Sequence, residues 1–237
     1  MDPRLQHVLD NLDNITIGVD EPFQFHCTQC GQCCIHREDI LLNPQDLFRM
    51  ARYLKQSPRD VVEHYCEVYT GPDSRMPIVR LLPEGPTMRC PFLVRNKCRI
   101  HEAKPTVCAM FPIGRAHGFD PKTGKPVPGI LYIFDRPPCG DNSETHTVRE
   151  WLDSFNIPVD DSFYLEWSES MAIFTQWFRQ LENINSAATA ILARPVVYER
   201  LYLSYHTSQN FMPQFQQNLQ IAKAFLQRLM EGLGGKV

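Results

Sequence analysis

One stretch decides how the surrounding chain folds and which chemistry it can carry: Cys27-Thr28-Gln29-Cys30-Gly31-Gln32-Cys33-Cys34. It places four of the nine cysteines of a 237-residue chain side by side. Three of them follow the spacing C-x2-C-x2-C, which lets a tight loop wrap one face of a compact ion or cluster. Gly31 suits a loop whose backbone must reach left-handed angles. Because thiolates are soft ligands that select zinc, copper(I) or iron–sulfur clusters, the stretch predicts a metal site.

The run differs from the common cysteine spacings. A bacterial ferredoxin run, C-x2-C-x2-C-x3-C-P, would need a cysteine where Arg37 stands. A zinc ribbon would need a second close C-x2-C pair, and the chain has one such run. Adjacent cysteines point in different directions, so we expect Cys33 and Cys34 to serve two metal atoms of a cluster, or two neighbouring sites, rather than one tetrahedral ion.

A second set of cysteines follows further along the chain. Cys90 and Cys98 stand at the two ends of a predicted hairpin, and Cys139 stands in a rigid Pro-Pro-Cys-Gly turn. No single spacing in this set is diagnostic. Cys66 is instead expected to be a buried core residue of a predicted helix. The predicted metal ligands are therefore Cys27, Cys30, Cys33, Cys34, Cys90, Cys98, Cys108 and Cys139.

Eight thiols exceed what one centre uses, since a tetrahedral ion or a four-iron cluster takes four. The chain therefore has either two sites, or one site with spare thiols. We expect the cofactor to be an iron–sulfur cluster, with 4Fe–4S favoured and zinc as the alternative. Basic residues that flank the cysteines would offset the negative charge of the thiolates.

The combined motifs resemble a known family. The pattern resembles the cysteine-cluster family called the zinc- or iron-chelating domain (YkgJ-like, C-x2-C-x2-CC type), and the resemblance covers roughly residues 23–140. It rests on the first cysteine run, Cys90-Pro91-Phe92-Leu93, Asn96 to Glu102, Lys104-Pro105-x2-Cys108 and Phe111-Pro112. His101 and Lys104 stand where the family pattern usually has Tyr and Arg. The family resemblance implies bound zinc or iron–sulfur, and it extends to flagellin lysine N-methylases, which share such a cluster.

The net charge, the apolar runs and the motifs that are absent argue against several classes of function. The net charge of −3 argues against a nucleic-acid binder, which would carry a basic excess. No run of eighteen apolar residues occurs, so we expect no membrane span. The beginning of the chain lacks an apolar signal core, so we expect a cytoplasmic, reducing location in which thiols persist. Walker, G-x-S-x-G and G-x-G-x-x-G motifs are absent from the sequence, which leaves nucleotide-binding and hydrolase functions without support.

The predicted fold class is mainly α, with a small β hairpin or sheet in an irregular, metal-organised cysteine-rich half. We place that half at residues 1–142 and a helical half at 143–237, packed as one unit. Residues 18–40 show no clean period and are expected to be irregular. Helices are expected over 4–17, from 44 onward, 58–69, 146–155, 160–182, 184–206 and 212–231, and strands over 76–82 and 130–134, with a hairpin over 87–100.

Three functions follow from this pattern. The first is a metalloprotein that binds one or two iron–sulfur centres and has a redox or cofactor-related role. The second is a zinc protein in which the metal staples an interaction module. The third, implied by the resemblance alone, is a SAM-dependent lysine N-methylase-like enzyme. A protein partner or protein substrate fits all three, whereas the sequence identifies no catalytic residue.

Overall fold

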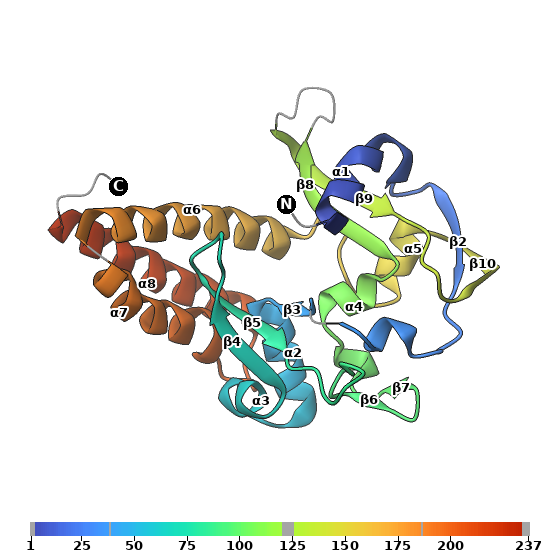
Figure 1. Ribbon diagram of the computed structural model, residues 1–237, viewed down its shortest axis with the longest axis horizontal. Coiled ribbons are helices and arrows are strands. Elements are labelled where there is room, and N and C mark those ends of the chain that lie inside the picture. The colour runs from blue at the N-terminus through green and yellow to red at the C-terminus, as the bar shows by residue number, and fades with distance from the viewer. Residues whose placement is uncertain (1–2, 38, 120–125, 186, 234–237) are drawn as a thin grey trace. The chain divides into compact units, whose positions relative to one another are not determined.

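The computed structural model describes residues 3–37, 39–119, 126–185 and 187–233 (Figure 1). The chain divides into two compact units. Unit 1 comprises Met1–Cys34, Val94–Lys97 and Thr106–Leu165, and unit 2 comprises Ile35–Leu93, Cys98–Pro105 and Glu166–Val237. The structure is helix-rich with small antiparallel sheets, which confirms the predicted fold class.

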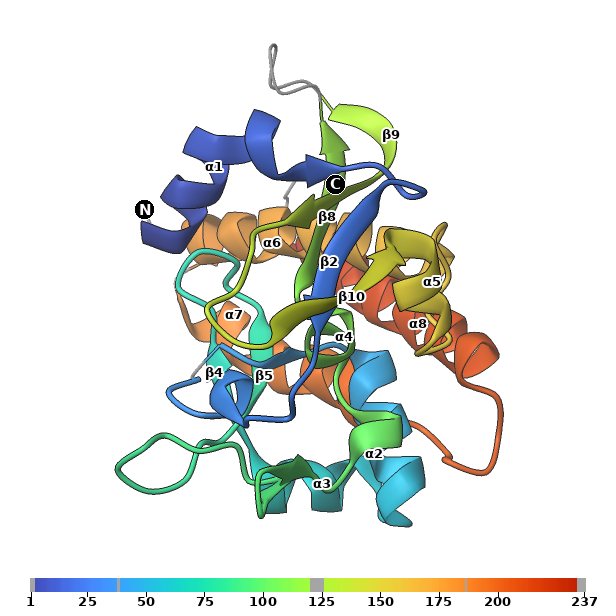
Figure 2. The same cartoon turned by 90° about the vertical axis from the view of Figure 1, so that its right-hand side faces the viewer.

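Unit 1 contains a three-stranded antiparallel sheet (Figure 2). Helix α1 (Pro3–Ile15) leads directly into β1 (Thr16–Ile17), which pairs with β9 (Pro126–Phe134). Strand β8 (Ile113–Phe119) pairs with the other edge of β9. The β8–β9 ladder includes the pair Arg115↔Tyr132. The predicted strand at 130–134 is therefore the second half of a longer strand.

A two-stranded sheet in unit 1 carries the first cysteine run. Strand β2 (Pro22–His26) pairs antiparallel with β10 (Asp141–Thr147). Phe23 and Phe25 alternate with exposed residues along β2 and are each 4% exposed. The prediction that residues 18–40 are irregular is thus wrong for 22–26, because two aromatic side chains at period two give the strand a buried face.

The core of unit 1 lies between these sheets and two short helices, α4 (Thr106–Met110) and α5 (Val148–Asp153). The Trp151 indole N–H donates to the Met110 carbonyl oxygen over 3.0 Å and so joins α5 to α4. The buried side chains of this core are Ile17, Phe23, Phe25, Ala109, Met110, Ile113, Tyr132, Val148, Leu152 and Ile157.

Unit 2 contains two capped helices, α2 (Pro44–Leu54) and α3 (Pro58–Tyr65). Asn43 and Ser57 cap them, and each forms a reciprocal capping box with the acidic residue three positions later. A proline occupies the first position of each helix. The predicted helix starts are therefore confirmed, and their physical basis is the satisfaction of the free N–H groups in the first turn.

A three-stranded sheet in unit 2 has the order β3-β5-β4. Strand β4 (Cys66–Thr70) follows α3 without a loop and pairs antiparallel with β5 (Pro77–Leu81), and β3 (Leu41–Leu42) pairs with the other edge of β5. The predicted helix at 58–69 is therefore too long. The β-branched and aromatic residues after position 65 favour a strand, and their helical spacing fitted both structures.

Two further elements lie in the segment that carries Cys90 and Cys98. Strands β6 (Leu93–Val94) and β7 (Lys97–Cys98) pair as a hairpin. The turn residues Arg95 and Asn96 both have left-handed backbone angles, with φ of 49° and 62°. A short 3-10 helix, η2 (His101–Ala103), follows. The predicted hairpin and the position of its turn are confirmed.

The remaining helices of the chain are α6 (Ser162–Asn185), α7 (Ala187–Tyr198) and α8 (Phe211–Gly232). Helix α6 buries Phe163, Phe174, Phe178 and Leu181, which recur at helical spacing along one side. The helix of α7 continues past Pro195 and widens into a π-helical turn, η3 (Glu199–Leu203), so the proline does not end it. No helix in the described part of the chain is long and apolar enough to cross a bilayer.

Candidate metal centre

The first cysteine run forms a tight loop that begins where β2 ends. Cys27 and Cys30 are exposed, and Cys33 and Cys34 are half-buried in the 3-10 turn η1 (Gln32–Cys34). Gly31 has a φ of 76°, in the region where glycine is favoured, and its carbonyl oxygen accepts a hydrogen bond from the Cys34 N–H over 2.9 Å. The predicted role of Gly31, a left-handed position within the cysteine loop, is confirmed.

The pairing of β2 with β10 brings Cys139 to this loop. Asp141 lies opposite His26 in the antiparallel ladder, so residues that precede Asp141 lie opposite residues that follow His26. Gly140 has a φ of 74°, and a Cβ atom there would lie 2.6 Å from the His26 carbonyl oxygen. The backbone beside Cys139 thus packs directly on the end of β2, where Cys27 begins the loop.

The pKa of the Cys139 thiol depends in part on three thiols of the cysteine loop. Burial raises its pKa above the ordinary value, and the neighbouring sulfurs of Cys30, Cys33 and Cys27 raise it further. A hydrogen bond with Cys30 acts in the same direction. The Cys139 turn therefore lies near the first cysteine loop, although more than a hundred residues separate the two segments in the sequence.

The adjacent cysteines Cys33 and Cys34 lie with their sulfur atoms 3.8 Å apart. Two thiolates bound to one tetrahedral zinc ion at about 2.3 Å would stand about 3.8 Å apart. The separation therefore suits joint binding of one ion as well as the binding of two atoms of a cluster that the sequence predicts.

The other three predicted ligands lie on separate elements. Cys108 is half-buried on α4 of unit 1. Cys98 is half-buried at the end of β7, and Cys90 is half-buried before β6, where its carbonyl oxygen accepts a hydrogen bond from the Leu93 N–H over 3.0 Å. These three residues remain predicted ligands on the strength of their pattern in the sequence, whereas Cys34 also contacts Cys33 within the loop.

His26 precedes the cysteine loop, and its ring faces the side chains of β10. Its Nδ1 atom lies 3.0 Å from the Ser143 hydroxyl oxygen and 3.3 Å from an Asp141 carboxylate oxygen, and its Nε2 atom lies 3.7 Å from Glu144. Both ring nitrogens are thus directed at a hydroxyl and two carboxylates. The ring of His26 therefore helps to hold β10 against β2.

The donor chemistry of the thiol set fits a soft metal centre. Thiolates that lie close together repel one another, and a cation relieves that repulsion while holding the thiols deprotonated. Within the described ranges, no three or more His, Cys, Asp and Glu side chains are already closed around the position of a single metal ion. The set is thus defined by its soft donors and their placement on one loop and one turn.

Cys66 is not one of the predicted metal ligands. It is 8% exposed at the start of β4, and burial raises the pKa of its thiol to about 12. Its predicted role as a core residue is confirmed, although it lies on a strand rather than on a helix. A residue that the sequence analysis did not single out is Gly140, whose only signal was its position after the Pro-Pro-Cys turn.

Comparison with known proteins gives one result. Residues 26–124 match the family model CxxCxxCC, described as "Putative zinc- or iron-chelating domain". Searches of curated proteins and of solved structures find no significant match. The matched residues include every predicted ligand except Cys139, which lies beyond them. Metal binding by the cysteine-rich segment is therefore supported, because residues 26–124 match the model of a zinc- or iron-chelating domain.

Proposed function

We propose that this chain is a metalloprotein whose unit 1 binds an iron–sulfur cluster of the 4Fe–4S type through Cys27, Cys30, Cys33 and Cys139. The observation that carries the proposal is the placement of Cys139 beside a C-x2-C-x2-C loop. Ferredoxin-type clusters take three ligands from such a loop and the fourth from a distant part of the chain. The ligand that the local sequence lacks after Cys33 is thus supplied from the β9–β10 connection.

The cysteine loop, the β2–β10 ladder and the exposed cysteines each contribute to binding of the cluster in this proposal. The left-handed positions at Gln29 and Gly31 fold the loop back on itself, and the β2–β10 ladder fixes the distance between the loop and the Cys139 turn. The cluster would supply one-electron redox chemistry when bound. The exposure of Cys27 and Cys30 keeps one side of the set within reach of solvent or of a partner protein, which suits a redox or cofactor-related role.

A zinc-binding structural module is the second candidate, because one observation favours it. The 3.8 Å separation of the Cys33 and Cys34 sulfurs suits a single tetrahedral ion. In that case the metal would hold the loop after β2 in place without redox chemistry, and a chelator would unfold the loop.

Anaerobic purification of the full chain, followed by iron, zinc and acid-labile sulfide analysis, separates the two candidates. An iron–sulfur protein contains iron and sulfide in equal amounts and shows broad visible absorbance that dithionite bleaches. Cys139→Ser should then lose the cluster, while Cys66→Ala, which removes a thiol outside the set, should retain it. Stoichiometric zinc in a colourless anaerobic preparation, with no sulfide, would reject the iron–sulfur proposal in favour of the zinc module.

A further inference from the structure

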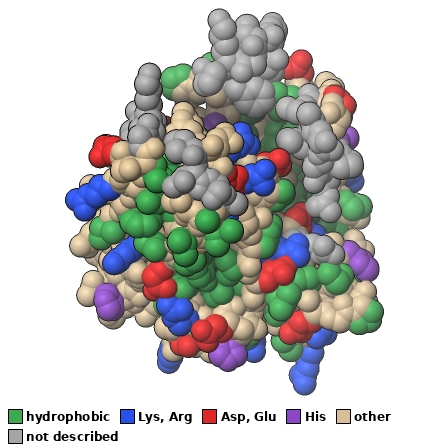
Figure 3. Space-filling view, turned by 60° about the vertical axis from the view of Figure 1, so that its left-hand side comes forward, with side chains coloured by type: hydrophobic (Ala, Val, Ile, Leu, Met, Phe, Trp, Pro, Cys, Tyr) green, Lys and Arg blue, Asp and Glu red, His purple; other side chains and the backbone are tan. Residues whose placement is uncertain are grey.

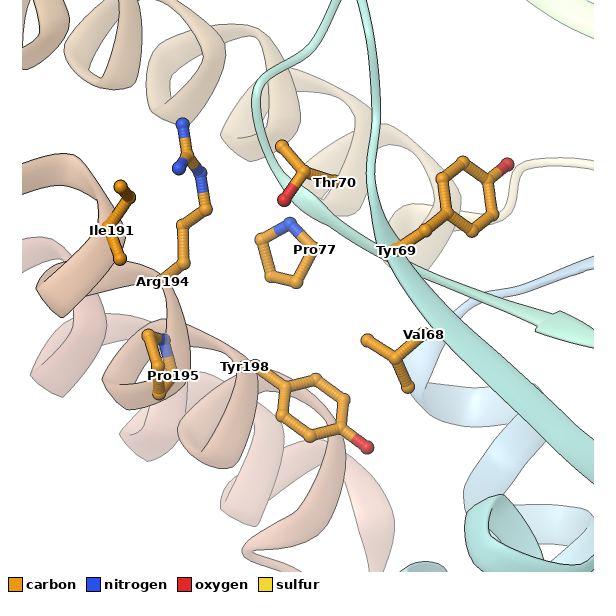
Figure 4. Close-up of a pocket in the computed structure, with 8 residues that line it drawn as sticks. All are labelled: Val68, Tyr69, Thr70, Pro77, Ile191, Arg194, Pro195 and Tyr198. Atoms are coloured by element: carbon orange, nitrogen blue, oxygen red, sulfur yellow. The ribbon is translucent and has the colours of Figure 1, made fainter. Parts of the chain in front are cut away.

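The apolar surface of unit 2 and the thiol-rich loop of unit 1 offer different chemistry. Hydrophobic side chains gather on the face of the molecule that Figure 3 presents. Unit 2 also has a groove of about 430 Å³ between α7 and the hairpin of β4 and β5, with Ile191 and Pro195 on one wall and Val68 opposite them (Figure 4). The described residues that line this groove include no thiol. The reactive side chains considered next are therefore those of the first cysteine run.

Cys34 is the thiol of the first cysteine run that the proposed iron–sulfur centre leaves unused. That centre takes Cys27, Cys30 and Cys33 from the run, and Cys139 from the turn before β10. Cys34 follows Cys33 directly in the turn η1, and the sulfur atoms of the two residues lie 3.8 Å apart. Both side chains are half-buried. The two sulfur atoms are therefore in contact although no bond joins them.

Backbone hydrogen bonds on both sides of the pair hold it in this arrangement. On the side before the pair, the Gly31 carbonyl oxygen accepts a hydrogen bond from the Cys34 N–H over 2.9 Å. On the side after it, the His36 N–H donates to the Thr87 carbonyl oxygen over 3.0 Å. The contact between the two sulfur atoms therefore lies within a fixed turn rather than in a free chain segment.

Thiol–disulfide exchange converts such a contact into a covalent bond. The thiolate of one cysteine attacks a sulfur atom of glutathione disulfide, which forms a mixed disulfide and releases one glutathione thiolate. The neighbouring thiolate then attacks the protein sulfur of the mixed disulfide, so that the Cys33–Cys34 bond forms and the second glutathione leaves. Two protein thiols are oxidised, one glutathione disulfide is reduced to two glutathione molecules, and the two thiol protons pass to the glutathione thiolates.

A disulfide between adjacent cysteines is readily reversed. The Cα atoms of adjacent residues are about 3.8 Å apart across a trans peptide bond. The Cα atoms of residues joined by a disulfide are usually about 4.4–6.8 Å apart, and departures from this geometry strain the bond and make it more reducible. Strained disulfides are the labile, regulatory ones. A Cys33–Cys34 bond would therefore form under oxidising conditions and open again when a thiol reductant returns.

We propose that Cys34 is a resolving thiol, which in the metal-free chain forms a disulfide with Cys33 in the presence of glutathione disulfide and so withdraws Cys33 from the metal-binding set. Metal binding and this disulfide exclude each other, because one sulfur atom cannot serve both. Cys30 and Cys139 are less suited to such a bond, since their segments meet only through the β2–β10 ladder. The consequence for metal binding rests on the proposed function, whereas formation of the disulfide does not.

Mass spectrometry of the full-length protein, incubated with glutathione disulfide and a chelator and then alkylated and digested, tests this inference. The wild type should contain the Cys33–Cys34 disulfide, seen as a peptide that is lighter by two hydrogen atoms than its reduced form and that dithiothreitol restores. Cys34→Ser should instead retain glutathione on Cys33, because the second attack lacks its thiol. Cys66→Ala, which removes a buried thiol outside the loop, is the matched control and should form the same disulfide as the wild type.

Three results would overturn the inference: no Cys33–Cys34 disulfide in the metal-free wild type, a disulfide that joins Cys33 to another cysteine such as Cys30, or the Cys33–Cys34 disulfide in chains that keep their full metal content. The wild-type peptide decides the matter even if Cys34→Ser fails to fold. Failure of the proposed function gives a different result. If iron and sulfide are present but the disulfide does not form, the inference alone fails. If the disulfide forms in a chain that contains neither iron nor sulfide, the proposed function alone fails.

Discussion

Substitution of Gly140 by alanine tests how the chain brings Cys139 to the cysteine loop. Gly140 has a φ of +74°, and an added Cβ would lie 2.6 Å from the His26 carbonyl oxygen and 2.6 Å from an aromatic carbon of Phe25. The left-handed backbone costs a non-glycine residue about 1–2 kcal/mol. Forcing a methyl group against backbone and a buried ring costs about 1–3 kcal/mol more. The free energy of unfolding should therefore fall by about 2–5 kcal/mol, a large share of the total for a domain of this kind.

Gly85 supplies a matched control for this experiment. Its φ is +66°, and a Cβ there would have nothing within 4 Å. Gly85→Ala therefore carries the backbone cost alone, about 1–2 kcal/mol. Urea unfolding of both variants, monitored by circular dichroism, gives the difference, and metal analysis shows whether displacement of the Cys139 turn releases the metal. Equal stability of the two variants, with full metal content in Gly140→Ala, would refute the role assigned to the β2–β10 contact.

Two further predictions concern stability. The raised pKa of Cys66 keeps its thiol protonated in the folded chain up to about pH 12, whereas the unfolded thiol ionises above about 9.0. The free energy of unfolding should therefore decline between these two pH values by up to about 1.4 kcal/mol per pH unit. If chemical unfolding of Cys66→Ala shows an equally steep decline with pH, the Cys66 thiol is not its cause. Arg115 and Asp161 form a buried ion pair at 2.7 Å, each 8% exposed, so Asp161→Asn should cost about 3–5 kcal/mol by leaving a buried charge. Asp20→Asn, at the exposed pair with Arg149, should leave the melting temperature near the wild-type value, and a similar loss in both variants would argue against burial as the reason.

Local signals predicted the helix starts of unit 2 because their chemistry is local. Asn43-Pro44 and Ser57-Pro58 carry both the capping side chain and the fixed backbone angle of the first turn. The helix expected over 212–231 is likewise present as α8, with Phe215 and Leu226 buried on one side of it. Strand β10 was missed because Asp141–Thr147 is polar and poor in β-forming residues, so its structure depends on pairing with β2.

The candidate site was predictable as a set of residues but not as an arrangement. Soft ligands at short spacing identified the first cysteine loop. The partner of that loop depends on the register Asp141↔His26, a contact between segments far apart in the sequence that no local pattern specifies. The need for glycine at position 140 also arises from this distant contact, because a Cβ atom there would collide with the carbonyl oxygen of His26.

In the proposed function, Cys139 completes a metal-binding set begun by Cys27, Cys30 and Cys33. The most direct measurement is the metal and sulfide content per chain of Cys139→Ser, purified anaerobically beside the wild type and Cys66→Ala. We predict that Cys139→Ser loses one whole centre and that Cys66→Ala keeps the wild-type content. Wild-type metal and sulfide content in Cys139→Ser would contradict it.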